Sequence, residues 1–334
     1  MGKFELIYPN YYKKFRCIAG DCRDNCCIGW EIDVDGDTLR KYEKIGGDFG
    51  ARLEKSIENG SFVLNGERCP FLNGDNLCDI IINLGEDSLC SICAHHPRFV
   101  EQFGTRTEIG LGLSCQTAAE LILSADLSGY LVRSFTDDEA EIYGFCDNDD
   151  DTDMLAYLTE LRDNIFALIS GASSVYDFAA PILSFCGGSP SPAGETESAA
   201  YFSDVCRFLC ALEPVDDNWR RLISAVSDAP YINAEYDTAL CKSLAHYFVY
   251  RYLLTALFDG NVEEKLLFSM FSMAFCGYIV QLNGGGHLGG RYTAAELCAL
   301  YSKQIEYSGE NMSLVFEHCR YNGLFSADNL FRLM

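Results

Sequence analysis

The sequence predicts a mainly α-helical protein, in which a cysteine-rich, irregular α+β module is followed by an all-α helical bundle. Two observations carry this prediction: nine of the 17 cysteines lie between Cys17 and Cys115, and apolar residues recur at helical spacing from residue 154 onward. The hydrophobic content of 49% is typical of a folded chain with a large core. We therefore expect a cysteine-rich module over residues 1–130, an acidic linker over 131–153 and an all-α domain over 154–334.

The N-terminal module is expected to consist of loops with short helices and strands between them. The expected elements are helices over residues 37–44, 48–57 and 116–127, a strand over 61–64 before the Asn65-Gly66 turn, and a strand-like alternation over 108–113. Such a segment has little core of its own, so a bound metal would contribute free energy to its folding.

The second part of the chain shows apolar spacing near 3.6 residues, which predicts helices. These are expected over residues 154–169, 201–212, 219–226, 238–258, 262–282, 294–306 and 311–320. Residues 266–282 carry no charge, but a membrane span needs about 20 apolar residues, so we expect a buried core helix there and no membrane partner. Residues 187–194, rich in Gly, Ser and Pro, are expected to form a flexible loop between two helices. Residues 284–290 are also expected to form a loop between helices, because the strand that precedes a phosphate-binding loop is missing.

The charge of the chain limits its partners. There are 49 acidic and 25 basic residues, and the net charge of −24 repels phosphate backbones, so nucleic acid is not expected to bind. The first residues show neither the apolar run of a signal peptide nor the myristoylation pattern. Seventeen cysteines then favour the reducing cytoplasm, where thiols stay free to bind metal, over a secreted disulfide framework. The sequence does not predict an oligomeric state.

Four cysteines fall in one eleven-residue run, Cys17-Ile-Ala-Gly-Asp-Cys22-Arg-Asp-Asn-Cys26-Cys27. Packing does not explain this run, because adjacent cysteines cannot easily share one hydrophobic face. Clustered thiols instead supply soft ligands for a thiophilic ion, so a metal or iron–sulfur site is the leading interpretation.

Further thiols follow at Cys69, Cys78, Cys90, Cys93 and Cys115. Zinc and an iron–sulfur cluster are both compatible with the set. Only one Cys-x2-Cys pair is present, which weakens a structural zinc site without excluding it. The cysteine triplet of radical-type clusters is not met either, because position 29 is Gly. The eight cysteines after residue 115 are sparser and lie in apolar helical surroundings, so residues such as Cys206, Cys210 and Cys276 are expected in the core.

Several strings in the N-terminal third resemble one known family. The string Tyr11-Tyr-Lys-Lys-Phe-Arg-Cys17, the cysteine run ending in Gly29-Trp30 and the string Cys69-Pro-Phe-Leu look like the flagellin lysine-N-methylase family, which belongs with other cysteine-cluster proteins. The agreement continues from about residue 8 to 122 through Cys78-Asp-Ile, Leu84-Gly-Glu, Pro97-Arg98 and Leu113-Ser-Cys115. A weaker echo lies at residues 305–311. The resemblance implies a cytoplasmic protein-lysine N-methyltransferase of the bacterial flagellum, which uses S-adenosylmethionine and a [4Fe-4S] cluster and acts on flagellin.

The same resemblance implies a set of metal ligands. The matched thiols are Cys17, Cys22, Cys26, Cys27, Cys69, Cys78, Cys93 and Cys115. Cys90 looks like an addition to the pattern, and His96 stands where relatives have Tyr. Eight thiols could serve one cluster plus a second metal, and the sequence does not divide them.

Other residues near the thiols are candidates for binding the cofactor. Arg98 could hold the methionyl carboxylate of S-adenosylmethionine, with a structural ion pair as the alternative. Trp30 could form a lid over the thiol site, with plain aromatic packing as the alternative. His95 and His96 could complete a mixed Cys/His site or form a solvated pair before a proline turn.

No catalytic residue can be assigned from the sequence. Methylation of lysine requires a neutral amine, and Glu101, Glu108 and His96 are the titratable groups nearest the cysteines, but nothing selects among them. A second interpretation belongs to another class: a non-catalytic module, stapled by zinc or a cluster, whose acidic surface binds a basic protein partner.

Overall fold

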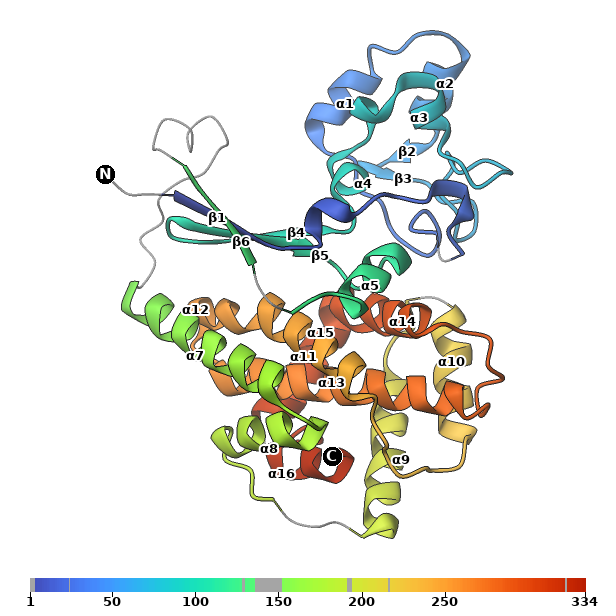
Figure 1. Cartoon of the computed structure of the whole chain (residues 1–334). Helices are drawn as coiled ribbons and strands as arrows, with labels where there is room; N and C mark the ends of the chain where they lie inside the picture. The colour runs from blue at the N-terminus through green and yellow to red at the C-terminus, as the bar shows by residue number, and fades with distance from the viewer. Residues whose placement is uncertain are drawn as a thin grey trace.

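The computed structural model describes residues 4–23, 25–127, 130–135, 152–190, 194–215, 217–321 and 323–334. Figure 1 shows a small cysteine-rich lobe above, a sheet beside it and a large body of helices below. The predicted fold class is confirmed, because strands are confined to the N-terminal part and the rest of the described chain is helical.

The main sheet has four strands in the order β4-β5-β1-β6. The strands are β1 (Phe4–Pro9), β4 (Arg98–Phe103), β5 (Arg106–Leu111) and β6 (Tyr130–Phe135). β1 lies parallel to β5 and antiparallel to β6, and β4 and β5 form an antiparallel hairpin. The strand-like alternation near residue 108 belongs to β5, whereas the other strands of the sheet were not predicted.

The cysteine-rich lobe has its own small core. Its elements are α1 (Gly36–Tyr42), α2 (Gly47–Lys55), β2 (Ile57–Glu58), β3 (Ser61–Phe62), α3 (Asp79–Leu84) and α4 (Ser91–His95). The buried residues include Leu53 and Phe71 together with Cys69 and Cys90. Asp35 caps α1 by accepting a hydrogen bond from Thr38 N, and it also accepts one from Ser91 N at the start of α4. The expected short helices and the expected strand at residue 61 are confirmed.

The helical body contains both long and short helices. They are α5 (Gln116–Leu123), α7 (Thr152–Gly171), α8 (Val175–Phe185), α9 (Glu195–Ala211), α10 (Asp217–Asp228), α11 (Thr238–Tyr252), α12 (Ala256–Asp259), α13 (Val262–Gly284), α14 (Ala294–Glu306), α15 (Gly309–Arg320) and α16 (Ala327–Leu330). Single 3-10 turns lie at η1 (Tyr12–Lys14), η2 (Ala19–Asp21), η3 (Glu86–Ser88), η4 (Leu253–Thr255) and η5 (Phe331–Leu333). The predicted helices are confirmed, with α8 and α16 added and the stretch 238–258 divided among α11, η4 and α12.

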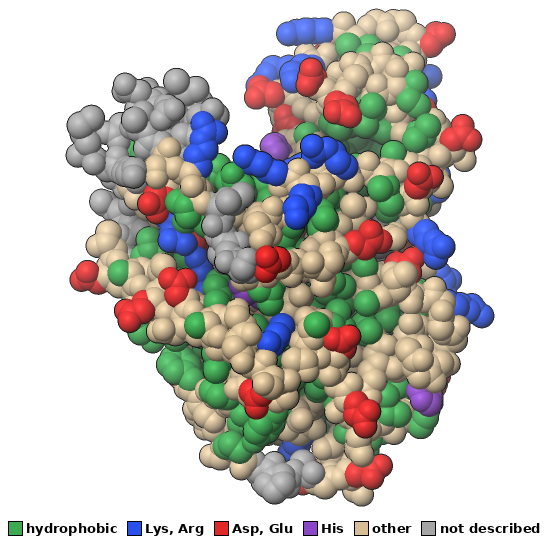
Figure 2. All heavy atoms as spheres, in the orientation of Figure 1, with side chains coloured by type: hydrophobic (Ala, Val, Ile, Leu, Met, Phe, Trp, Pro, Cys, Tyr) green, Lys and Arg blue, Asp and Glu red, His purple; other side chains and the backbone are tan. Residues whose placement is uncertain are grey.

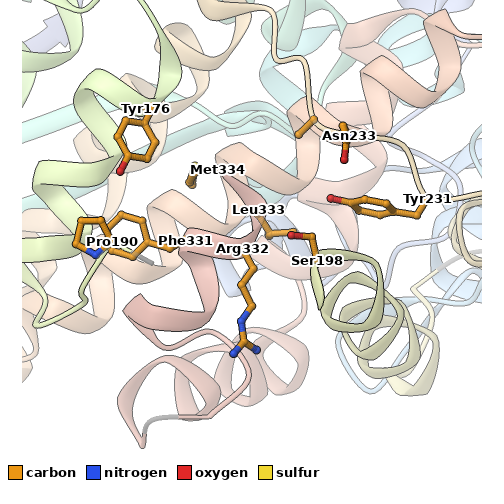
Figure 3. Close-up of a pocket in the computed structure, with 10 residues that line it drawn as sticks. Tyr176, Pro190, Ser198, Tyr231, Asn233, Phe331, Arg332, Leu333 and Met334 are labelled. Atoms are coloured by element: carbon orange, nitrogen blue, oxygen red, sulfur yellow. The ribbon is translucent and has the colours of Figure 1, made fainter. Parts of the chain in front are cut away.

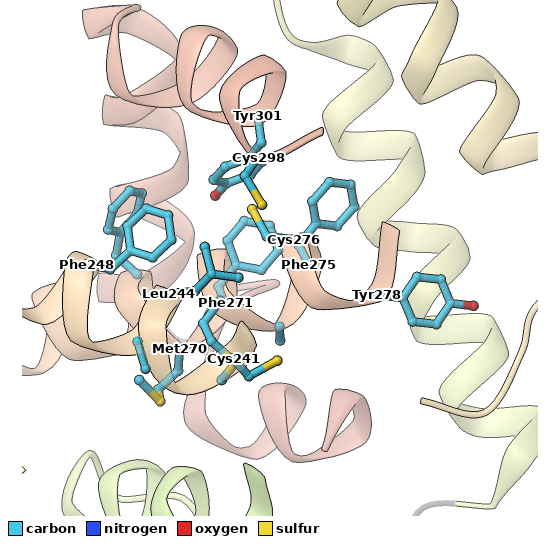
Figure 4. Packing of buried hydrophobic residues seen from close by; sticks show 14 of the residues in the cluster. Cys241, Leu244, Phe248, Met270, Phe271, Phe275, Cys276, Tyr278, Cys298 and Tyr301 are labelled. Atoms are coloured by element: carbon cyan, nitrogen blue, oxygen red, sulfur yellow. The ribbon is translucent and has the colours of Figure 1, made fainter. Parts of the chain in front are cut away.

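Helix α13 forms the centre of the body. It is long and apolar enough to cross a membrane, yet 83% of its apolar window is buried inside the protein, which confirms the predicted core helix. Figure 4 shows its Phe271, Phe275 and Cys276 packed against Phe248 of α11 and Tyr301 of α14.

The later cysteines are mostly core residues, as predicted. Cys206, Cys276 and Cys298 are buried, and Figure 4 shows the thiols of Cys276 and Cys298 pointing toward each other. The prediction that Cys210 is a core residue is wrong, because its side chain is exposed. It follows the buried Leu209 on α9, and one residue turns a helix by about 100°, which places Cys210 on the solvent side.

The large core extends beyond the helical body. Phe15, Leu111 and Leu113 from the N-terminal part share one cluster with residues of α7, α11, α13 and α14. The sheet and α5 therefore pack on the helices, while the cysteine-rich lobe keeps its separate core. Most of the predicted acidic linker, residues 136–151, lies outside the described residues, so the division at 131–153 stays a prediction.

Candidate metal and ligand site

The cysteine run lies on the helical body, although the two are far apart in sequence. Arg23 forms an ion pair with Glu296 of α14 at 3.5 Å, and the ring of Trp30 lies 5.2 Å from that of Tyr307. Cys115 is the residue that precedes α5. The fold thus places the segment that carries the cysteine run next to α14, while Cys115 stands at the start of α5.

Several of the predicted ligands lie close enough to influence one another. A hydrogen bond with Cys26 and burial raise the pKa of the Cys27 thiol, and Cys69 and Cys93 add to this shift. A hydrogen bond with Cys90 and burial likewise raise the pKa of Cys93, with contributions from Cys26 and Cys69. The backbone supports the grouping, because Cys69 N donates to Cys27 O at 2.8 Å.

Cys26 connects these thiols to others. Burial raises the pKa of Cys115 to about 11, and Cys22 and Cys26 contribute to the increase. Burial also raises the pKa of Cys78, again with a contribution from Cys26. Cys17 is exposed, and its sulfur accepts a hydrogen bond from Ala19 N at 3.4 Å.

Cys90 is also part of the group, although the resemblance did not include it. It is buried, and the hydrogen bond with Cys93 lowers its pKa to about 7. It stands just before α4, and Cys93 lies within that helix. Eight cysteines of the N-terminal third thus each lie within electrostatic range of at least one other: Cys22, Cys26, Cys27, Cys69, Cys78, Cys90, Cys93 and Cys115.

The donor chemistry of this group suits a thiophilic metal. Neighbouring thiolates disfavour one another's charge, and a bound cation would relieve that repulsion while stabilising the thiolates. In the part of the chain that the structure describes, however, no three His, Cys, Asp or Glu side chains are arranged as ligands of one ion. The predicted ligand set therefore stays a prediction.

Three aromatic rings meet beside the thiols, at a place we call the aromatic junction (Trp30, His96 and Tyr307). The Trp30 ring lies 6.1 Å from His96 and 5.2 Å from Tyr307, and His96 lies 6.3 Å from Tyr307. A Cβ atom on Gly112 would collide with the Tyr307 hydroxyl and the Pro97 carbonyl, so this close approach needs glycine. The junction joins the lobe, the sheet and α14.

Buried charges lie next to the aromatic junction. Lys303 of α14 is only 3% exposed, and its Nζ lies 5.4 Å from the centre of the Trp30 ring. Burial lowers the pKa of His96 to about 4, and the charges of Lys303 and Arg98 contribute, so His96 is neutral near pH 7. Figure 2 shows Lys and Arg side chains gathered around the hollow between the lobe and the rest of the molecule.

A buried ion pair supports the junction from below. Arg251 of α11 lies 3.1 Å from Glu306 Oε2 and stands 5.3 Å from the centre of the Tyr307 ring. The hydroxyls of Tyr247 and Tyr252 donate to the same Glu306 oxygen at 2.9 and 2.7 Å. This network fixes the C-terminal end of α14, and with it Tyr307.

The other candidate residues have different positions. Arg98 stands 5.2 Å from the Phe15 ring and hydrogen-bonds Tyr12. His95 is exposed and hydrogen-bonds Ser91, whereas His96 is half-buried at the junction, so the expected solvated pair holds only for His95. Glu108 is buried and forms a bidentate ion pair with Arg162, with both N–O distances at 2.7 Å. Its carboxylate is therefore engaged in a structural ion pair and is not a candidate for a catalytic base.

Sequence reasoning missed Lys303 and Arg251 and gave Tyr307 no role. The weak echo at residues 305–311 contained Glu306 and Tyr307 and was the only signal for them. Glu101 lies on β4, where burial raises the pKa of its carboxyl group and Arg251 opposes the shift.

Two cavities lie away from the junction, in the C-terminal body. Figure 3 shows the first, a cavity of about 510 Å³ lined by residues such as Tyr176, Tyr231 and Arg332. The second, of about 800 Å³, lies beside Cys186 and Glu264. Neither contains a residue predicted to bind metal or cofactor.

Comparison with known proteins points to one activity. Over 135 residues the chain is 29% identical to the lysine-N-methylase of Salmonella typhimurium and to that of Salmonella choleraesuis, covering 37% of this chain and 34% of each relative. This chain resembles lysine-N-methylases over part of its length. It is also 28% identical to the flagellar biosynthetic protein FliU of Salmonella muenchen over 135 residues, which cover 80% of that protein. No family model and no solved structure matches the chain.

The aligned region spans about a third of the length of the two curated methylases. The comparisons agree in part with the resemblance predicted from the N-terminal strings, because the relatives are two lysine-N-methylases and a flagellar biosynthetic protein. The names of the two methylases suggest a methyltransferase role for this chain, and the comparisons say nothing about cofactors.

Proposed function

We propose that this chain is an S-adenosylmethionine-dependent protein-lysine N-methyltransferase of the cytoplasm, with flagellin as its substrate. The observation that carries the proposal is the similarity to lysine-N-methylases, together with a flagellar protein among the relatives. The proximity of several cysteines of the N-terminal third supports it, because the same cysteines carry the resemblance to the methylase family.

The metal in this proposal is a [4Fe-4S] cluster, with zinc as the alternative. Its ligands would come from the eight predicted thiols, with Cys90 as a further donor. When bound, a cluster would hold the loops of the lobe or position the sulfonium of the cofactor.

The chain's own residues would prepare the methyl acceptor. Lysine attacks a sulfonium only as the neutral amine, and its ammonium ordinarily keeps its proton near pH 7. The charges of Lys303 and Arg98 that lower the pKa of His96 would also disfavour a protonated lysine beside the junction, and the aromatic rings would reduce its contact with water. Both effects lower the pKa of a lysine that enters there, so part of the required deprotonation comes from the environment.

The test is a methyl-transfer assay under anaerobic conditions. Metal-loaded protein is mixed with methyl-labelled S-adenosylmethionine and purified flagellin, and flagellin with acetylated lysines serves as the control. We expect label on lysines of the unmodified flagellin only. Absence of label with the cluster intact would refute flagellin as the substrate.

A thermal-shift measurement separates this proposal from a non-catalytic interaction module. A ligand at 100 times its dissociation constant stabilises the folded state by about 2.7 kcal/mol. S-adenosylmethionine should therefore raise the melting temperature of a methyltransferase. An interaction module would show no shift.

A further inference from the structure

Four basic side chains lie together where the chain leaves β1. Lys13 and Lys14 belong to the 3-10 turn η1, Arg16 comes shortly after it, and all three are exposed. Arg98, at the start of β4, joins them, because its guanidinium stands 5.2 Å from the centre of the Phe15 ring. We call these four residues the basic patch (Lys13, Lys14, Arg16 and Arg98).

The charges of the basic patch are not matched by carboxylates. None of its four residues forms an ion pair with an Asp or Glu in the part of the chain that the structure describes. Arg16 instead donates hydrogen bonds to the backbone carbonyls of Lys13 and Phe15, at 3.1 and 2.6 Å. The Nζ of Lys13 lies 5.1 Å from the centre of the Tyr8 ring. Such contacts orient the cations and leave their net positive charge in place.

An unmatched basic patch stands out in a chain of net charge −24. The other short basic segment of the N-terminal part, on α1, differs because acidic residues are mixed into it: Arg40 pairs with Asp37, and Glu43 stands between Lys41 and Lys44. A negatively charged partner is repelled by most of an acidic surface and attracted to a local positive patch, which steers it to one place. The basic patch is therefore where such a partner would bind.

The basic patch lies next to the candidate site. Arg98 acts electrostatically on His96 of the aromatic junction, and Arg16 directly precedes Cys17, the first thiol of the cysteine run. In Figure 1 the dark blue segment that follows β1 passes between the sheet and the lobe. Figure 2 shows Lys and Arg side chains around the hollow at this place. A partner held by the basic patch would thus lie beside the thiols and the junction.

We propose that the basic patch is a docking surface for an acidic segment of another protein, whose carboxylates pair with Lys13, Lys14 and Arg16. Exposed cations along a turn suit a partner with several carboxylates in a row, because each exposed pair contributes little by itself. A nucleic acid would extend its phosphates over the acidic remainder of the surface. That the acidic segment belongs to the methyl acceptor rests on the proposed function: carboxylates near the target lysine would then bring that lysine to the site.

Fluorescence anisotropy with two labelled peptides tests this docking surface. One peptide consists of Glu and Gly residues around a single Lys, and the other has Gln in place of every Glu. Each is titrated with the full-length, metal-loaded protein under anaerobic conditions. We expect the Glu peptide to bind at low salt and the Gln peptide not to bind. Binding of the Glu peptide should weaken as salt is added, because salt screens exposed charge pairs.

Two triple variants separate the basic patch from the overall charge of the chain. Lys13→Gln/Lys14→Gln/Arg16→Gln should weaken binding of the Glu peptide by about tenfold, the combined effect of losing three exposed charge pairs. The matched control is Arg40→Gln/Lys41→Gln/Lys44→Gln, which removes the same charge from exposed positions in and directly after α1 and should bind like the wild type. Circular dichroism checks that both variants are folded.

Equal affinity of the two triple variants for the Glu peptide would overturn the proposal, as would equal binding of the Glu and Gln peptides. Binding of anionic lipid vesicles or duplex DNA through the basic patch, without binding of the Glu peptide, would overturn it in favour of that partner. Peptide binding through the patch without any lysine methylation would refute the proposed function alone. Methylation of flagellin with the same KM in the patch variant and in the wild type would refute this inference alone.

Discussion

The ion pair beneath the aromatic junction allows a quantitative prediction. The Glu306 side chain is fully buried, and its Oε2 receives two tyrosine hydroxyls and the guanidinium of Arg251. Its Oε1 has no partner among the described residues. In Glu306→Gln, the amide can keep its oxygen at the position of Oε2 and place its nitrogen at that of Oε1, so the hydrogen bonds survive and the charge is lost.

The loss of this charge leaves Arg251, whose side chain is 14% exposed, without its counter-charge. Removing one partner of a buried ion pair costs about 3–5 kcal/mol, and the retained hydrogen bonds favour the lower end, about 3 kcal/mol. Urea unfolding followed by circular dichroism measures the change. The control, Glu317→Gln at an exposed position of α15, should differ from the wild type by no more than about 0.5 kcal/mol. Equal midpoints for the two variants would refute the structural role of this pair.

Three further predictions concern the junction, the core and the thiols. Gly112→Ala forces a methyl group against Tyr307 and should cost about 1–3 kcal/mol in urea unfolding, whereas Gly74→Ala, with open space around it, should not. Burial, with a contribution from Arg162, lowers the pKa of His246 to about 3, so stability should fall as the pH drops from about 6.5 to about 3, by up to about 1.4 kcal/mol per pH unit. His246→Phe should show a weaker acid dependence of the unfolding midpoint, and an unchanged dependence would contradict the assignment. Cys26→Ser should lose bound metal in an elemental assay, because Cys26 lies among the other thiols, whereas the exposed Cys210→Ser should keep it.

The helical half could be predicted because its signals are local. Helix α14 agrees with the expected bounds, since Thr293 and Glu296 form a capping box and the apolar period continues to Glu306. Helix α8 was missed because Pro181 interrupts its helical signal.

The sheet was largely missed because its pairings are distant in sequence. β1 pairs with β6, so Phe4 lies opposite Phe135, and a short strand gives little periodic signal by itself. The same reason hid the aromatic junction. Trp30 meets Tyr307 only after the lobe has packed on α14, and no spacing rule connects residues so far apart.

The thiol cluster lies between these cases. Its residues could be chosen from their density and from the family resemblance, and the structure places several of them within electrostatic range of one another, while their role as metal ligands stays a prediction. The resemblance left Cys90 out of the expected metal ligands. Its burial and its hydrogen bond with Cys93 associate it with the other thiols only once the structure is known. The burial of Lys303 could not be predicted, because a lysine within an amphipathic helix is ordinarily exposed to solvent.

The most direct test of the central claim is the metal content of protein purified without oxygen. Its visible absorption spectrum would be recorded, and iron, sulfide and zinc would be assayed on the same sample. The proposed function predicts a broad visible band with iron and sulfide in equal amounts, and loss of both in Cys26→Ser. A colourless protein that carries stoichiometric zinc would contradict the cluster and favour the non-catalytic interaction module.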